Sequence, residues 1–133
     1  MSIPIYTPTN KILHEVKVDF LNRGVPSIVH LVQGDNSLPV LEIFLYKGSA
    51  RFNVTDLNPT EINVRCKNYD RSDAYTPVNG VNDLGNIVYL EIPENMTNAY
   101  GTSVLVVEVK IGDFVMCSAP FHLEIDRNPV WGL

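Results

Sequence analysis

Apolar and polar residues alternate along several short stretches of this chain, and this period of two is the feature that most limits how it can fold. The clearest stretch is 61–67 (EINVRCK), which places Ile62, Val64 and Cys66 on one side and polar or charged residues on the other. Successive side chains of a strand point to opposite faces of a sheet, whereas an α-helix repeats about every 3.6 residues. The stretch therefore predicts a β-strand with one buried face.

The same alternation recurs before and after this strand. Strands are predicted over 12–20, 28–32, 38–47, 86–92, 102–112 and 113–125, the last with an edge or a bulge at Pro120, because proline cannot donate to a sheet. The predicted inward faces are His14, Val16, Val18 and Phe20; Leu41, Ile43 and Leu45; and Val88, Leu90 and Ile92.

Turn residues separate these strands at intervals of about ten residues. The one candidate for helical structure is a short turn that begins at Pro93 and ends before Gly101. Strands at this spacing predict an all-β protein, an antiparallel β-sandwich of about seven to eight strands with a short helical turn. With 133 residues the chain is expected to form one domain, divided into an N-terminal arm and strand (1–20), the sandwich (21–126) and a C-terminal tail (127–133).

Charge and composition argue against two kinds of partner. The net charge is −5 and the ten basic residues are scattered, which does not suit a nucleic-acid binder. No apolar run is long enough to cross a membrane, and the first residues lack the pattern of a secretory signal. We therefore expect a chain of cytosolic origin in which Cys66 and Cys117 are reduced and buried, although a disulfide between them is the alternative in a secreted protein.

No motif of an enzyme is apparent. The three histidines (His14, His30 and His122) lack the spacing of a zinc site, and the polar stretch 68–86, although rich in Asp and Asn, does not match a calcium-binding loop. No nucleophile motif, paired carboxylates or glycine-rich phosphate loop can be identified. We expect no catalytic residue, no metal and no cofactor.

Aromatic residues near the predicted loops are candidates for binding. Tyr69, Tyr75 and Tyr100 are candidate stacking faces for a glycan, the alternative being contact with protein. Trp131 lies in the short C-terminal tail, where a large apolar side chain is expected to pack on its own domain or on a partner.

The stretch from about residue 28 to 125 resembles the N-terminal domain of the phage baseplate upper protein family, from phages that infect Gram-positive bacteria. The matching features are an apolar strand followed by QGDNS at 33–37, then VLEIFLYKGSARFNVTDLNPTEINVRCKN, a polar hairpin, GNIVYLEIPENMTNAYG leading into the last hairpin, and a trailing Asn-Pro. The resemblance implies an immunoglobulin-like sandwich. Family members usually continue into a further part, whereas this sequence ends at Leu133 and has an additional N-terminal strand and arm.

The resemblance also implies a function. It implies a structural virion protein, a baseplate or tail-fibre-anchoring module for host adhesion, with other phage structural proteins as partners and a homo-oligomer, a trimer being favoured. A head decoration protein or head-fibre adaptor of the same fold, and a carbohydrate-binding module, are the alternatives. The predicted partner contacts are Ile3, Ile5, Tyr6, Ile12 and Trp131, and Gln33, Gly34 and Asp35 are predicted to form a structural turn.

Overall fold

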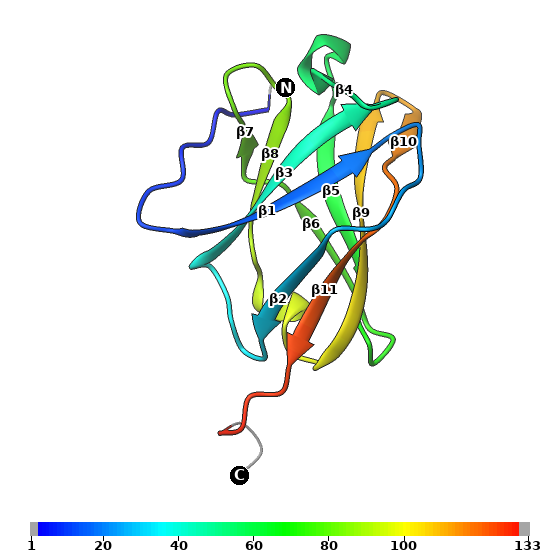
Figure 1. The fold of residues 1–133 in the computed structure, drawn as a ribbon. Helices are drawn as coiled ribbons and strands as arrows, with labels where there is room; N and C mark the ends of the chain where they lie inside the picture. Colours follow the sequence, from blue (N-terminus) through cyan, green and yellow to red (C-terminus); the bar gives the residue numbers. More distant parts are fainter. Residues whose placement is uncertain (1–2, 131–133) are drawn as a thin grey trace.

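The computed structural model describes residues 3–130, which form two stacked β-sheets (Figure 1). Among the described residues there are eleven strands and two short 3₁₀ turns. In chain order these are β1 (Ile12–Asp19), β2 (Ile28–Val32), β3 (Pro39–Lys47), β4 (Ala50–Arg51), η1 (Val54–Leu57), β5 (Glu61–Lys67), β6 (Asp73–Pro77), β7 (Gly80–Val81), β8 (Ile87–Glu91), η2 (Glu94–Met96), β9 (Gly101–Ile111), β10 (Phe114–Cys117) and β11 (Phe121–Asp126).

The all-β sandwich and the short helical turn are confirmed. One sheet has the order β1-β3-β8-β7, with β4 on β3, and the other has the order β2-β11-β9-β5-β6, with β10 on β9. The predicted turn after Pro93 is η2, which buries Met96. Within residues 3–130 no helix is long and apolar enough to span a membrane.

The expectation of a purely antiparallel sandwich is wrong at one edge of each sheet. Strand β1 runs parallel to β3, with Ile12 beside Pro39, and β2 runs parallel to β11, with Ile28 beside His122. Hydrophobic alternation has the same period in parallel and antiparallel strands, so the sequence pattern does not distinguish them. The fold is thus a β-sandwich with mixed sheets, and its immunoglobulin-like form stays a prediction.

The expected number of strands was too low for two reasons. The polar stretch 68–86, expected as a connection, contains β6 and β7, which contribute few apolar residues to the core, chiefly Ala74 and Val81. The expected last strand is divided: β10 and β11 both pair with β9, and the segment that contains Pro120 separates them.

The predicted inward faces form the core between the sheets, except that His14, expected to face inward, is only half-buried and lines a surface cleft near the start of β1. Val16, Leu41, Ile43, Val64 and Leu90 are all fully or almost fully buried. Phe20 is partly buried against this core, where it meets the Phe52 ring edge-on. Val40, which does not belong to the predicted inward face of its strand (Leu41, Ile43 and Leu45), is also buried.

Candidate interaction surface

The N-terminal arm is held on the edge of its own sheet. Ile5 forms an isolated parallel bridge with Val81, where Tyr6 N–H donates to Val81 C=O at 3.0 Å and Val81 N–H donates to Pro4 C=O at 3.0 Å. Gly80 makes this contact possible, because a Cβ at that position would lie 2.6 Å from the Pro4 carbonyl oxygen. The arm therefore extends the β7 edge of the domain by a short strand-like segment.

The predicted contact residues of the arm differ in exposure. Ile3 packs partly against the core, whereas Ile5 is 57% exposed. The Tyr6 hydroxyl donates to a Glu91 carboxylate oxygen at 2.7 Å, and burial together with this carboxylate raises the Tyr6 pKa to about 12. Among residues 3–11, Ile5 is thus the large apolar side chain that is mostly exposed and available to a partner.

Ile12 lies at the opposite side of the same sheet, on the open edge of β1. Ile12 N–H donates to Leu38 C=O on the β3 side, so the backbone groups of Leu13 and Glu15 point away from the sheet, where no described residue pairs with them. In β2, Gln33 N–H donates to Asp126 C=O on the β11 side, which leaves the backbone groups of Ile28 and His30 pointing outward.

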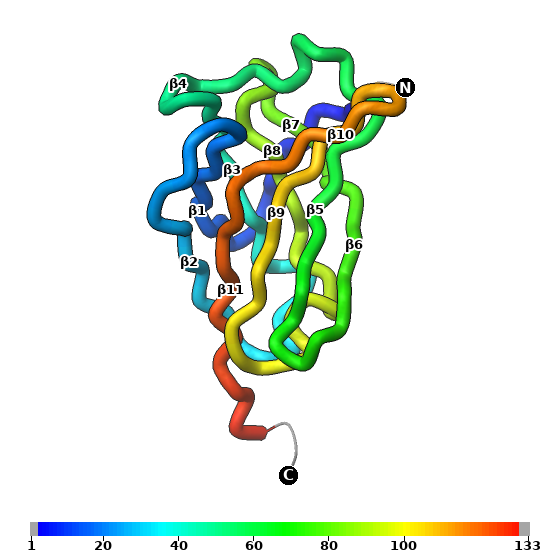
Figure 2. The backbone as a smooth tube through the Cα atoms, turned by 90° about the vertical axis from the view of Figure 1, so that its right-hand side faces the viewer, coloured from blue at the N-terminus to red at the C-terminus, as the bar shows by residue number. Residues whose placement is uncertain are grey.

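The two open edges lie next to each other in space, although they belong to different sheets (Figure 2). They are joined at one end, where Lys17 N–H donates to Ser27 Oγ at 3.1 Å. At the other end they border a cleft of about 470 Å³. It is lined by Ile12, His14, His30, Leu31, Val32, Gly34, Asp35, Asn36, Leu38 and Pro39.

The predicted turn borders this cleft. Gly34 has a φ of +97°, a conformation that favours glycine, and Asp35 Oδ2 accepts a hydrogen bond from Val32 N–H at 2.9 Å. The Gln33 side chain links two other segments. Its Nε2 donates to Asn98 C=O, after η2, at 2.8 Å, and its Oε1 accepts from Asn128 N–H, in the C-terminal tail, at 3.3 Å. The turn fastens the end of β2 to the C-terminal tail.

The three tyrosines do not form one platform. Tyr69 and Tyr100 lie at the same end of the sandwich, both flanking Gly101, where the lack of a side chain leaves room for the Tyr69 ring, because a Cβ there would lie 2.5 Å from Tyr69 Cγ. Tyr75 lies on the outer face of the six-stranded sheet, with the Arg65 guanidinium 4.3 Å from its ring centroid. The structure thus brings together Tyr69 and Tyr100 and separates Tyr75 from them. Trp131 lies outside the described residues.

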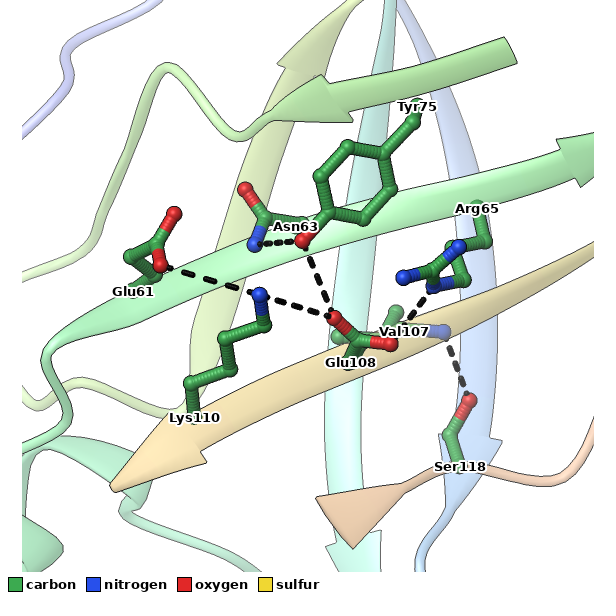
Figure 3. A network of polar contacts seen from close by, with 8 residues as sticks. All are labelled: Glu61, Asn63, Arg65, Tyr75, Val107, Glu108, Lys110 and Ser118. Atoms are coloured by element: carbon green, nitrogen blue, oxygen red, sulfur yellow. Dashed lines mark hydrogen bonds and ion pairs between the residues drawn. The ribbon is translucent and has the colours of Figure 1, made fainter. Parts of the chain in front are cut away.

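Tyr75 belongs to a polar network that sequence reasoning missed (Figure 3). Its centre is Glu108, a carboxylate only 4% exposed, which accepts from Arg65 Nε at 2.6 Å and from the Tyr75 hydroxyl at 3.0 Å. Lys110 Nζ lies 3.9 Å from the same carboxylate, and Asn63 Nδ2 donates to the Tyr75 hydroxyl at 2.7 Å. A charged residue inside the apolar run VLVVEVKI is the signal from which this network could have been found.

The network neutralises a charge that would otherwise be costly to bury. Burial alone would raise the Glu108 pKa, but the hydrogen bonds from Arg65 and Tyr75 and the nearby positive charges lower it below the usual value. Both carboxylate oxygens already accept from protein donors. The arrangement therefore stabilises the outer face of β5, β6 and β9.

The remaining candidate chemistry is dispersed. Within residues 3–130 no three His, Cys, Asp or Glu side chains are placed to hold a metal ion. Cys66 is buried, and burial raises its thiol pKa to about 12, whereas Cys117 is exposed, so the expectation that both cysteines are buried is wrong for Cys117. Cys117 sits on the short strand β10, which is open to solvent on that side.

Comparison with known proteins finds a fold relative. No family model matches the sequence, and no curated protein matches it. Among the solved structures that match is the N-terminal domain of phage TP901-1 ORF48, with a TM-score of 0.60 and 7% sequence identity, covering 86% of this chain and 98% of that chain. The resemblance to the N-terminal domain of the baseplate upper protein family is confirmed at the level of the fold.

Proposed function

We propose that this chain is a structural component of a bacteriophage virion, a baseplate or tail-fibre-anchoring module that binds other phage structural proteins. The observation that carries the proposal is the fold match to the N-terminal domain of phage TP901-1 ORF48, which extends over 98% of that domain. At 7% identity this match concerns the arrangement of strands, and the function is inferred from it.

The surface of the domain supports a role in assembly. Open sheet edges present unpaired backbone donors and acceptors, which are ready to pair with a strand of another chain. Around the edges of β1 and β2 lie several exposed apolar side chains: Ile12 (52% exposed), Leu13 (44%), Ile28 (55%) and Val32 (41%). These features suit a protein whose partners cover it permanently.

The finer parts of the proposal concern the assembly itself. We expect a homo-oligomer, with a trimer favoured, on an immunoglobulin-like variant of the sandwich, and no enzymatic activity. Ile5, Ile12 and Trp131 are the proposed contacts with neighbours, while Ile3 and Tyr6 hold the arm from which Ile5 projects. Residues 1–20 and 127–133 are proposed as the assembly segments that flank the sandwich.

Two other functions fit parts of the structure. A head decoration protein or head-fibre adaptor would use the same edges at another place in the particle. A host-glycan module is favoured by Tyr69 (66% exposed) and Tyr100 (51% exposed), which lie at one end of the sandwich. Replacing both with alanine would abolish retention on a host-glycan column if they bind the sugar, and would leave particle assembly unchanged.

The proposal is tested by deleting the coding sequence from the genome that carries it and imaging the released particles by negative-stain electron microscopy. We expect particles without a complete tail tip, and restoration of the tip when the chain is supplied from a plasmid. A defect confined to the head would support the decoration or adaptor function instead. Particles of normal appearance that never contain the chain by mass spectrometry would refute a virion role.

A further inference from the structure

Residues 3–6 of the N-terminal arm are docked on the five-stranded sheet, and residues 7–11, here called the strap, join them to β1. Ile5 lies beside Val81 on β7, at one edge of the sheet, whereas Ile12 begins β1 at the other edge. Figure 1 shows this path, in dark blue, from the β7 edge to the start of β1. The docked residues and β1 therefore lie at opposite edges of one sheet, although only the strap separates them in sequence.

The strap is weakly held. Among the described residues, no backbone hydrogen bond involves residues 7–11, and Lys11 Nζ makes the one side-chain hydrogen bond of this segment, to Ser37 C=O. Asn10 has a φ of +57°, a left-handed conformation that is costlier for asparagine than for glycine. Segments with few buried contacts open with a small free energy. The strap can therefore take another course with little loss of packing.

The docked residues, by contrast, fit their site closely. Tyr6 N–H and Pro4 C=O both form hydrogen bonds with the backbone of Val81, and Pro4 approaches β7 where Gly80 has no side chain. The Tyr6 hydroxyl donates to Glu91 on β8 at 2.7 Å. Each of these contacts joins residues 4–6 to the body of the domain, and none of them involves the strap. The arm of a second copy would therefore make the same contacts.

We propose that, in the homo-oligomer, the arm of each copy docks on the β7 edge of the next copy instead of its own. This inference rests on the proposed function, because it supplies the contact that builds the oligomer. Exchange of an identical segment keeps every contact of the arm and adds contacts between the two bodies that the strap joins. The surface that gives the arm differs from the surface that receives it, so copies join head to tail and close into a ring, as a trimer requires.

A pair of cysteines distinguishes the two positions of the arm in the full chain. Ile5→Cys and Val81→Cys place thiols on paired residues of neighbouring strands, roughly 5 Å apart at Cα, which is within the range for a disulfide. Cys117→Ser removes the exposed native thiol. After oxidation, we expect a band at a multiple of the chain mass on a non-reducing denaturing gel. The control lacks Ile5→Cys and is expected to run at the mass of one chain.

Two results with the cysteine pair would overturn the proposal. An oxidised protein that runs at the mass of one chain, with both introduced thiols consumed, would show that each arm rests on its own domain. Introduced thiols that stay free in the folded protein would show that the arm lies on neither edge.

Gly80→Ala tests the same contact without cysteines, in case the disulfide variant fails to fold by circular dichroism. We expect light scattering to give the mass of one chain for Gly80→Ala, and a multiple of it for wild type and for Gly24→Ala, where a Cβ meets nothing. An oligomer that survives Gly80→Ala would overturn the exchange and leave the homo-oligomer intact. Wild-type protein that is monomeric at every concentration would refute the homo-oligomer as well.

Discussion

Asp19 at the end of β1 offers the most direct test of the forces that hold the corner of the sandwich together. Its Oδ1 accepts hydrogen bonds from the backbone N–H groups of Leu21 at 2.7 Å, Asn22 at 2.8 Å and Gly48 at 3.1 Å, and its Oδ2 accepts from Ser49 N–H at 3.0 Å. One carboxylate thus joins the connection after β1 to the turn between β3 and β4. We predict that Asp19→Asn destabilises the fold, because the amide is neutral and presents a donor where the second carboxylate oxygen accepts.

The magnitude follows from the pKa of the carboxyl. Partial burial acts to raise it, but the four backbone donors outweigh this effect and lower the Asp19 pKa from 3.8 to about 2. That difference corresponds to roughly 2 kcal/mol at full strength, and solvent screening of a partly exposed group reduces it to about 1 kcal/mol. We therefore expect Asp19→Asn to cost about 1 kcal/mol at pH 7, or roughly 3 °C in Tm for a domain of this size.

The pH dependence identifies the ionised carboxylate as the source. Because the folded pKa is depressed, this contribution is fully present above pH 3.8 and is lost as the pH falls through about 2. Urea unfolding followed by circular dichroism at pH 7, 5, 3 and 2 should therefore show a gap between wild type and Asp19→Asn that shrinks at the two lowest values. Asp113→Asn, at an exposed position in the turn after β9, is the control and should be neutral. Equal stability at pH 7, or a gap that is constant with pH, would refute the reasoning.

Two further predictions concern the arm and the polar network. Gly80→Ala should displace the arm, because the new Cβ would meet the Pro4 carbonyl oxygen. We expect faster hydrogen exchange at the Val81 amide and a loss of about 1–2 kcal/mol in unfolding free energy from the hydrogen bonds released. Gly24→Ala, where a Cβ meets nothing, should leave the exchange rate and the stability unchanged. Glu108→Gln should lower the free energy of unfolding in urea by about 1–3 kcal/mol, because it removes the charge that pairs with Arg65 and Lys110. Glu94→Gln, at an exposed position, should change this free energy by less than about 0.5 kcal/mol. A Glu108→Gln protein as stable as wild type would contradict the role given to the network.

The buried faces were predictable from the sequence because each of them depends on local alternation. Leu41, Ile43 and Leu45 are buried as their spacing requires, and so are Val88, Leu90 and Ile92. Burial of Val40 was not predictable, because it results from tertiary packing on the side of β3 opposite the predicted inward face. Tyr89, on the outer side of β8, is likewise covered by the arm, because the centroid of the Tyr6 ring lies 5.4 Å from the centroid of the Tyr89 ring.

The surface was less predictable, since it depends on which segments meet in space. The β1–β3 and β2–β11 pairings place Ile12 on an open edge and His30 beside Glu124, which no spacing in the sequence indicates. The grouping of Tyr69 with Tyr100 around Gly101, and the position of Tyr75 beside Glu108, likewise follow from strand register. The partner contacts proposed for Ile5, Ile12 and Trp131 stay predictions.

The parallel pairing of β2 with β11 has a consequence for how the protein folds during synthesis. The register that joins Ile28 to His122 connects the first part of the chain to nearly the last, so the six-stranded sheet cannot close until the ribosome has released β11. Contacts so distant in sequence slow folding, because a long loop must be ordered before they form. Nascent chains stalled before residue 121 should therefore retain an unprotected β2, and a chaperone that shields this strand during translation would raise the yield of native protein.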